Sequence, residues 1–230
     1  MVHQPPPAGA APPQMPGRAV AAGSTIIGMT LSLAVGRPTL ADHVLPRGLV
    51  TDISLVVGGA ALTGLLAQVA IPLWPVPITG QTLAVLLVGS TLGASRGAIS
   101  MLVYALAGVA GVPWFSDAGH GLGALLSSTG GYIVGFILAA ALTGWLAQRQ
   151  WDRKFLHAAV TFLAGSGVVF LVGLPWLAFV TGADLAQTLQ WGLWPFIPGG
   201  IVKALIAAAL IPAIWQGVRR LDEAKGGGQR

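Results

Sequence analysis

From residue 52 onward the chain alternates between long apolar stretches and short polar or Pro/Gly-rich connections. A helix rises about 1.5 Å per residue, so roughly 20 apolar residues are needed to cross the hydrocarbon core of a bilayer. The second and third stretches are shorter than this, so we expect flanking residues or thinner, protein-filled surroundings to complete them. The pattern predicts an all-α polytopic membrane protein with six transmembrane helices, at approximately 52–71, 80–92, 97–112, 130–147, 155–177 and 200–217.

The residues before the first span have a different composition, with six prolines among Ala and Gly between positions 5 and 16. Such a segment buries too little apolar surface to fold. We therefore predict a disordered tail over 1–38, a six-helix membrane domain over 39–220 and a short flexible cytoplasmic tail over 221–230. The moderately apolar stretch 19–35 leaves open a cleaved signal segment or an additional span.

Composition supports the membrane assignment, because only 8% of the 230 residues are charged and 54% are hydrophobic. Soluble domains carry about 25% charged residues, so a soluble globular domain is excluded. The net charge of +5 comes from scattered Lys and Arg residues without a basic stripe, which argues against nucleic acid as a partner. The chain has no cysteine, which excludes disulfides, thiolate nucleophiles and Cys-ligated metals.

The positions of the basic residues predict the orientation. Eleven of the twelve lie before span one, between spans two and three, between spans four and five, or after span six. The alternate connections, 72–79, 113–129 and 178–199, contain no Lys or Arg. The positive-inside rule therefore places these three connections outside and both termini in the cytoplasm of a multi-pass plasma-membrane protein.

The three outer connections are rich in Pro, Gly and aromatic residues, and we expect them to close over one extracellular pocket. The second contains Gly119-His-Gly-Leu-Gly123, which permits a close approach of the backbone to a ligand. The clustered aromatic residues could form an interfacial belt, but some are expected to line an apolar pocket. The resulting candidates for substrate contact are Phe115, Asp117, Gly121, Gly123 and Tyr132.

Lys203 is the twelfth basic residue and lies inside the sixth span. A cation at the centre of a membrane helix costs about 2.5 to 3.5 kcal/mol on insertion scales, so it is expected to face the bundle interior and to have a partner. One interpretation is a substrate anchor that donates to a carboxylate or carbonyl oxygen. The alternative is a lysine that extends to the outer interface, paired with Asp184.

Two further sets of residues have both a structural and a functional interpretation. Gln81 begins span two and could cap the helix, or could offer a donor and an acceptor to an amide-like or ureido ligand. Ala60 and Gly64 stand four apart in span one, and such small-residue spacing serves internal packing or docking of a partner subunit.

The sequence offers little support for a catalytic site. Gly165-Ser166-Gly167 resembles a nucleophile turn only superficially, since no His follows it, and the predicted spans contain no Glu. His120 is better interpreted as an interfacial residue than as a metal ligand, because the other histidines fall in the tail or on the cytoplasmic side. No phosphate-binding loop occurs. We therefore predict a binding protein, not an enzyme, with no metal and no cofactor.

Several strings together resemble the BioY family, the biotin-specific substrate-binding S components of energy-coupling factor (ECF) transporters. The resemblance covers about residues 40–218. Its most specific parts are Pro-Val-Pro-Ile-Thr-Gly-Gln-Thr at 75–82 and Thr-Gly-Gly-Tyr at 129–132. The other matching strings are Gln-Val-Ala-Ile-Pro at 68–72, Gly-Val-Ala-Gly-Val-Pro at 108–113, Gly-Leu-Pro-Trp at 173–176 and Pro-Phe-Ile-Pro-Gly-Gly-Ile-Val-Lys at 195–203.

The resemblance implies a six-helix S-component bundle with a biotin site near the extracellular side, gated by the first outer loop. It also implies a transmembrane coupling (T) subunit, docked through Ala60 and Gly64, and partner ATPases of the ATP-binding cassette type that hydrolyse ATP. An S component for another vitamin and a non-transporting structural membrane protein are the alternatives, and self-association is left open. One departure stands out: many members carry an Asp three residues before the Lys, where this chain has Gly200.

Overall fold

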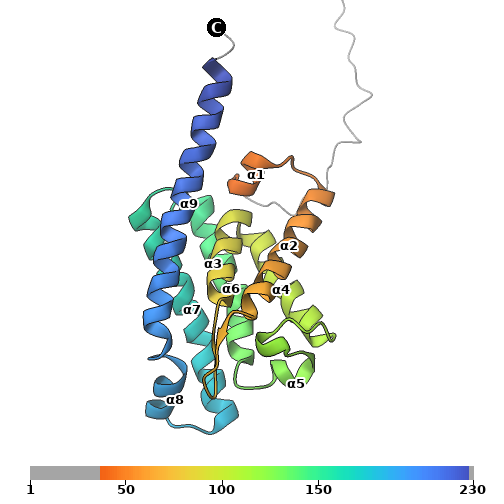
Figure 1. Ribbon diagram of the computed structural model, residues 1–230, viewed down its shortest axis with the longest axis vertical. Coiled ribbons are helices and arrows are strands. Elements are labelled where there is room, and N and C mark those ends of the chain that lie inside the picture. The colour runs from red at the N-terminus through yellow and green to blue at the C-terminus, as the bar shows by residue number, and fades with distance from the viewer. Residues whose placement is uncertain (1–36, 228–230) are drawn as a thin grey trace, which may run out of the picture. The chain divides into compact units, whose positions relative to one another are not determined.

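The computed structural model describes residues 37–227, with side chains as far as Arg220. The predicted tail therefore lies outside the described residues apart from positions 37 and 38, and the stretch 19–35 lies outside entirely. The described chain is mainly helical (Figure 1). Its longer helices are α2 (Leu49–Ala67), α3 (Gln81–Leu92), α4 (Ala94–Val109), α6 (Gly130–Gln148), α7 (Phe155–Thr181) and α9 (Phe196–Gly227).

These six helices coincide with the six predicted stretches. By length and hydropathy α2, α6, α7 and α9 can cross a membrane, whereas α3 and α4 are shorter apolar helices of 12 and 16 residues. The expected shortness of the second and third stretches is confirmed. That all six cross the membrane, and the side on which the termini lie, stay predictions.

The helix ends differ from those expected from hydropathy. Helix α2 ends at Ala67 because the chain turns into a two-stranded antiparallel sheet, β1 (Ala70–Ile71) and β2 (Ile78–Thr79). Helix α7 continues through Pro175 to Thr181, and α9 starts four residues earlier than expected. Helix α9 also includes residues 221–227, which the sequence had suggested as a flexible tail.

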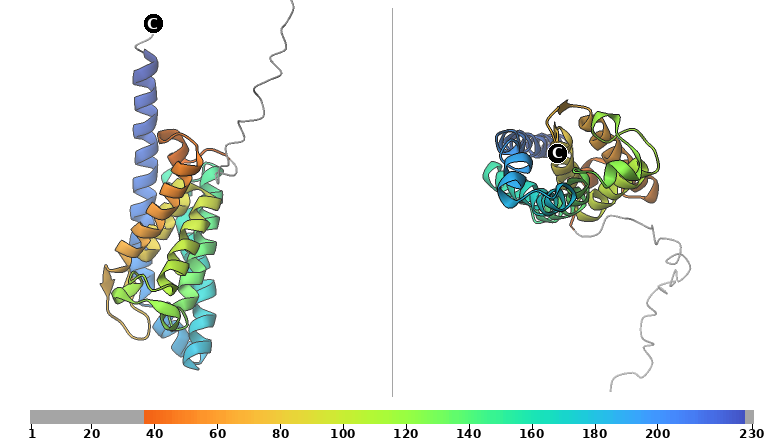
Figure 2. Two further views of the ribbon diagram at one scale, coloured as in Figure 1. Left: turned by 90° about the vertical axis from the view of Figure 1, so that its right-hand side faces the viewer. Right: turned by 90° about the horizontal axis from the view of Figure 1, so that it is seen from below.

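The shorter elements gather at the two ends of the bundle (Figures 1 and 2). The β-hairpin, the 3-10 turn η1 (Ser116–Ala118), α5 (Gly121–Leu125) and α8 (Leu185–Gly192) lie at one end. The short helix α1 (Leu40–Val44) lies at the opposite end, beside the start of α2. The three connections predicted to be outer loops therefore lie at the same end of the bundle.

Helix α6 packs against α3, α4 and α7, and small residues make this close packing possible. A Cβ atom added to Gly89 of α3 would lie 2.2 Å from the Thr143 hydroxyl oxygen of α6. A Cβ atom on Gly144 would lie 2.3 Å from the carbonyl carbon of Gly93. Apolar helices in a bilayer associate through such close backbone packing, because lipid chains are as apolar as the side chains they would replace.

A buried ionic cluster joins α1, α2 and α4 at the end opposite the hairpin. The Arg96 guanidinium lies 2.8 Å from the Asp42 carboxylate and 2.5 Å from that of Asp52, and all three side chains are at most 3% exposed. Arg47, whose side chain is 44% exposed, adds a second contact to Asp42. Two carboxylates and one enclosed guanidinium thus fix α1 and the start of α2 against α4.

The pKa of Asp42 reports on this cluster. Burial raises the pKa, but hydrogen bonds from the Thr39 backbone, Arg47 and Arg96 outweigh that effect and lower it from 3.8 to about 2. Because the folded pKa is depressed, the stabilisation is present above the unfolded value and is lost as the pH falls through about 2.

We predict that Arg96→Met lowers the free energy of unfolding by about 3 to 5 kcal/mol, because it removes the buried cation that the Asp42 and Asp52 carboxylates share. Denaturant unfolding of the purified protein in detergent measures this loss. The matched variant Arg47→Met removes an exposed partner and should cost less than about 1 kcal/mol. Equal losses for the two variants would show that the buried cluster has no special role.

Candidate ligand-binding site

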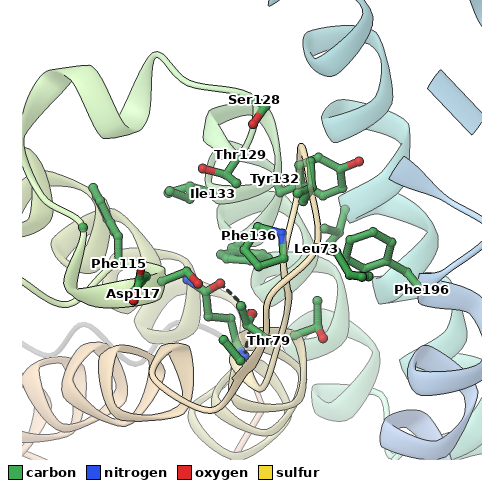
Figure 3. A pocket seen from close by; sticks show the side chains of 18 of the residues that line it. Leu73, Thr79, Phe115, Asp117, Ser128, Thr129, Tyr132, Ile133, Phe136 and Phe196 are labelled. Carbon is green, nitrogen blue, oxygen red and sulfur yellow. Dashed lines mark hydrogen bonds between the residues drawn. The ribbon is translucent and has the colours of Figure 1, made fainter. Parts of the chain in front are cut away.

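A cavity of about 660 Å³ opens among the β-hairpin, the segment 115–129 and the adjoining ends of α3, α6, α7 and α9. Figure 3 shows Phe115 and Asp117 on one side of it and Phe196 on the other, with the side chains of α6 between them. The volume falls in the range of small-molecule sites in proteins. The cavity therefore lies where the predicted outer connections converge.

Helical spacing explains why the helices line this space. The cavity wall from α6 consists of Thr129, at its N-cap, with Tyr132, Ile133 and Phe136, which follow at intervals of three, four and seven residues. Such positions share one helix face. The same spacing places the remaining wall residues of α7 and α9 on single faces, namely Ser166, Val169 and Phe170 on α7 and Phe196, Gly200 and Lys203 on α9.

The loop of the β-hairpin covers one side of the cavity. Val76 at the loop is 4% exposed and belongs to the same hydrophobic cluster as Tyr132 and Phe136. The Ser128 hydroxyl donates a 2.6 Å hydrogen bond to the Pro75 carbonyl, which connects the loop to the residues that precede α6. The ring of Trp74 contacts that of Trp191 at a centroid distance of 5.3 Å. The hairpin loop is thus held on both sides.

Lys203 extends from α9 across the cavity toward β2 and α3. Its Nζ donates to the Thr79 carbonyl oxygen and, at 3.1 Å, to the Thr82 hydroxyl. Neither partner carries a charge, and Lys203 forms no ion pair with any described residue. The expected alternative of a pair with Asp184 is wrong, because that carboxylate accepts the Gln187 amide and caps α8. Lys203 therefore places its ammonium group on the cavity without an ion-pair partner among the described residues.

Gln81 is held by hydrogen bonds on both sides of its amide. Its oxygen accepts from the Thr79 hydroxyl at 2.7 Å, and its nitrogen donates to the Tyr104 hydroxyl at 2.6 Å. Tyr104 is fully buried on α4, and its hydroxyl donates in turn to the Trp114 carbonyl at 3.2 Å. These bonds fix the orientation of the amide, so that the Gln81 side chain presents its remaining hydrogen-bonding capacity in one defined direction.

Glycine allows Phe115 to occupy its place in the cavity wall. A Cβ atom on Gly108 of α4 would lie 2.2 Å from the tip of the Phe115 ring, so only a residue without a side chain fits there. Asp117, two residues on, has a φ of 57°, and its neighbour Ala118 donates its amide to the Gln68 side chain. The end of α2 therefore supports the turn that brings Phe115 and Asp117 to the cavity.

Five of the seven residues predicted to contact substrate lie on this cavity: Gln81, Phe115, Asp117, Tyr132 and Lys203. Their contact with a substrate stays a prediction. The prediction for Gly121 and Gly123 placed them at the same site, but neither lines the cavity, and both lie in the short helix α5. His120 is exposed, and its ring contacts only the nearby Ala118 carbonyl.

The small residues of α2 lie in the internal packing. Ala60 is fully buried, and a Cβ atom added to Gly64 would lie 2.9 Å from the Cβ of Trp114, so a larger residue would be crowded there. Both residues are buried in this structure, and their docking of a partner subunit stays a prediction. The alternative interpretation, close packing within the bundle, describes their placement.

Sequence reasoning missed several residues of the wall, chiefly Phe136, Phe170 and Ser128. The signal for Phe136 was present, since it continues the face that begins at Thr129 and includes Tyr132. Phe170 and Ser128 carried no comparable signal, because their role depends on how α7 and the hairpin loop pack against α6.

Comparison with known proteins agrees with this geometry. The model of the BioY family matches residues 38–220. The chain belongs to the BioY family. Among its relatives, "Biotin transporter BioY2" of Lactococcus lactis is 34% identical over 167 residues, which cover 71% of this chain and 91% of the relative. "Biotin transporter BioY" of Rhizobium etli is 37% identical over 161 residues, or 67% of this chain and 86% of the relative.

A solved structure shares the fold of this BioY chain. It is the S-component for biotin from an ECF-type ABC transporter, with a TM-score of 0.66 and 24% sequence identity over 73% of this chain and 92% of the other. The S-component fold expected from the sequence is confirmed. Family membership places the protein among multi-pass membrane transporters and not among enzymes.

We predict that Tyr104→Phe lowers the free energy of unfolding by about 1 to 3 kcal/mol, because the buried Gln81 amide and the Trp114 carbonyl each lose a partner. Thermal unfolding in detergent measures the effect. Ser54→Ala is a suitable control, since its exposed hydroxyl bonds only to the Val50 carbonyl of its own helix. A Tyr104→Phe protein as stable as the control would contradict the proposed fixing of Gln81.

Proposed function

We propose that this BioY chain binds biotin in the cavity and takes it up across the plasma membrane as the substrate-binding S component of an ECF-type transporter. The observation that carries the proposal is the Lys203 ammonium, which lies on a cavity of mixed polar and apolar lining without a carboxylate partner. Relatives that are more than 30% identical over most of their length are named biotin transporters, and the solved structure with the same fold is an S-component for biotin.

The chemistry of biotin fits the lining of the cavity. Biotin combines an apolar ring and chain with a ureido group at one end and a carboxylate at the other. Phe115, Tyr132 and Phe136 supply apolar surface, whereas Lys203 can donate to a carboxylate or carbonyl oxygen and Gln81 can both donate and accept. An anion brought to Lys203 would compete with the Thr79 carbonyl for the same ammonium group, which connects ligand binding to the hairpin.

Gly200 sets this chain apart from the many BioY members that carry an Asp at that position. A Cβ atom at Gly200 would meet nothing within 4 Å, so packing does not require glycine there. Asp184 is committed to the cap of α8, and Asp117 is the carboxylate that lines the cavity. In our proposal Asp117 therefore supplies the acidic contact, and Lys203, which has no ion-pair partner among the described residues, contacts the ligand.

Transport in this proposal depends on partners. Biotin is the substrate, no cofactor is bound, and ATP is hydrolysed by ATPase subunits that work with a transmembrane coupling subunit. Both termini lie in the cytoplasm, and residues 39–220 form the membrane domain between a tail at 1–38 and a short C-terminal segment. Because Ala60 and Gly64 face inward, the coupling subunit would have to contact other residues unless α2 rotates on assembly.

The alternatives are an S component for a different vitamin and a structural membrane protein that transports nothing. If the substrate is a different vitamin, that vitamin would bind in the same cavity and would displace biotin in a competition measurement. A structural protein would show no saturable binding of any vitamin. Binding measurements with the purified protein therefore separate all three.

We predict that Lys203→Ala abolishes measurable biotin binding or weakens it by about 10- to 150-fold, since a charge-assisted contact contributes roughly 1.5 to 3 kcal/mol. Lys203→Met keeps the length and apolar stem of the side chain and should lose affinity similarly. Equilibrium binding of radiolabelled biotin measures both.

Lys154→Ala removes an exposed cation at the far end of the bundle and is the control for net charge. An unchanged elution profile and melting temperature would show that the Lys203 variants remain folded. Biotin affinity retained in a folded Lys203→Met protein would overturn the role of Lys203 as the anchor.

A further inference from the structure

A second hollow, of about 510 Å³, lies at the other end of α6. Its lining consists of Arg37, which precedes α1, and Trp145, Gln148 and Arg149 at the end of α6. At 1.5 Å per residue, Gln148 is about 24 Å along the helix from Tyr132 at the first cavity. The two cavities share no lining residue, so the second is a separate feature of the surface.

Both arginines at this hollow are exposed and form no ion pair with a described residue. The carboxylates nearby in the sequence are committed elsewhere: Asp42 and Asp52 to Arg96, and Asp152 to the Trp215 indole at 2.7 Å. The 36 residues before Arg37 contain no Asp or Glu. The neighbouring segments of this chain therefore offer these two guanidinium groups no carboxylate, and an anion that neutralises them has to come from another molecule.

The arginine on α6 is oriented by an aromatic ring. The guanidinium carbon of Arg149 lies 3.7 Å from the centroid of the Trp145 ring, which leaves the edges of the guanidinium group free to donate. Guanidinium groups bind phosphate oxygens through paired donors, and stacking on an aromatic face reduces the conformational freedom lost on binding.

An apolar stripe leads along α6 to the same place. Val134, Leu138 and Trp145 are 41%, 52% and 44% exposed, and their spacing of four and seven residues places them on one helix face, which Arg149 continues. In a membrane this face contacts lipid chains, and Trp is enriched where the chains give way to headgroups. The stripe thus runs from the hydrocarbon region to two cations.

We propose that this hollow is a binding site for an anionic phospholipid, with the headgroup phosphate between Arg37 and Arg149 and an acyl chain along the stripe of α6. The basic end of the bundle is the end that the charge distribution predicts to be cytoplasmic, where anionic lipids occur and where basic pockets between helices bind their headgroups. The site is independent of biotin binding at the opposite end of α6.

The test uses the purified full-length chain in a neutral detergent, with the melting temperature and the lipid retained in native mass spectrometry as readouts. Phosphatidylglycerol, phosphatidylcholine and inorganic phosphate are the probes. We expect phosphatidylglycerol to raise the melting temperature and to be retained, whereas the zwitterionic lipid and inorganic phosphate have little effect.

Two double variants with the same loss of charge separate a defined site from a general attraction to basic residues. Arg37→Gln with Arg149→Gln should weaken retention of phosphatidylglycerol on the order of tenfold, whereas Arg219→Gln with Arg220→Gln, on exposed positions of α9, should leave it unchanged. Arg149→Lys keeps the charge but loses the fork and much of the stacking, and should give an intermediate loss.

Equal losses in the two double variants would overturn the proposal and show only general electrostatic attraction. Stabilisation by inorganic phosphate equal to that by phosphatidylglycerol would overturn the assignment of a lipid as the ligand. Retention that survives in the Arg37→Gln, Arg149→Gln protein, with its melting temperature in detergent unchanged, would likewise contradict the site.

Discussion

The contact of Lys203 with the Thr79 carbonyl and the Thr82 hydroxyl is the interaction on which the cavity depends. An ammonium group inside an apolar bundle must find polar partners, and here it finds uncharged ones on β2 and α3. The same Thr79 holds Gln81, which in turn bonds to Tyr104. One chain of hydrogen bonds therefore joins α9, the hairpin, α3 and α4 around the space proposed for biotin.

Helix α6 provides the frame for this arrangement. Small residues on α3 and α6 allow the two helices to approach closely, as the spacing between Gly89 of α3 and Thr143 of α6 shows, and the first two turns of α6 supply Tyr132 and Phe136 to the cavity. Its last turn supplies Trp145 and Arg149 to the second hollow. Helix α6 thus contributes to two sites at its opposite ends, and the two sites share no residue.

The main features of the fold could be predicted because lipid imposes simple rules on sequence. Long apolar runs predicted the helices, and the lone cation in the last of them led to Lys203. Hydropathy could not predict the β-hairpin, because two-residue strands have no detectable period, nor the continuation of α7 beyond residue 177 to Thr181. Gly121 and Gly123 were placed at the site by a glycine-rich run that permits close approach of the backbone, and such a run does not tell which of its residues reach the cavity. Phe170 and Ser128 depend on tertiary packing, which no local pattern records.

Titration with radiolabelled biotin tests the assignment of the cavity to biotin most directly. It uses the purified wild-type chain without partner subunits, in the presence of excess thiamin or riboflavin. We predict saturable binding at one biotin per chain that neither competitor reduces, because the cavity supplies a single unpaired ammonium group and a fixed amide within one aromatic wall. Absence of saturable biotin binding, or displacement of biotin by either of the other vitamins, would contradict the assignment of the cavity to biotin.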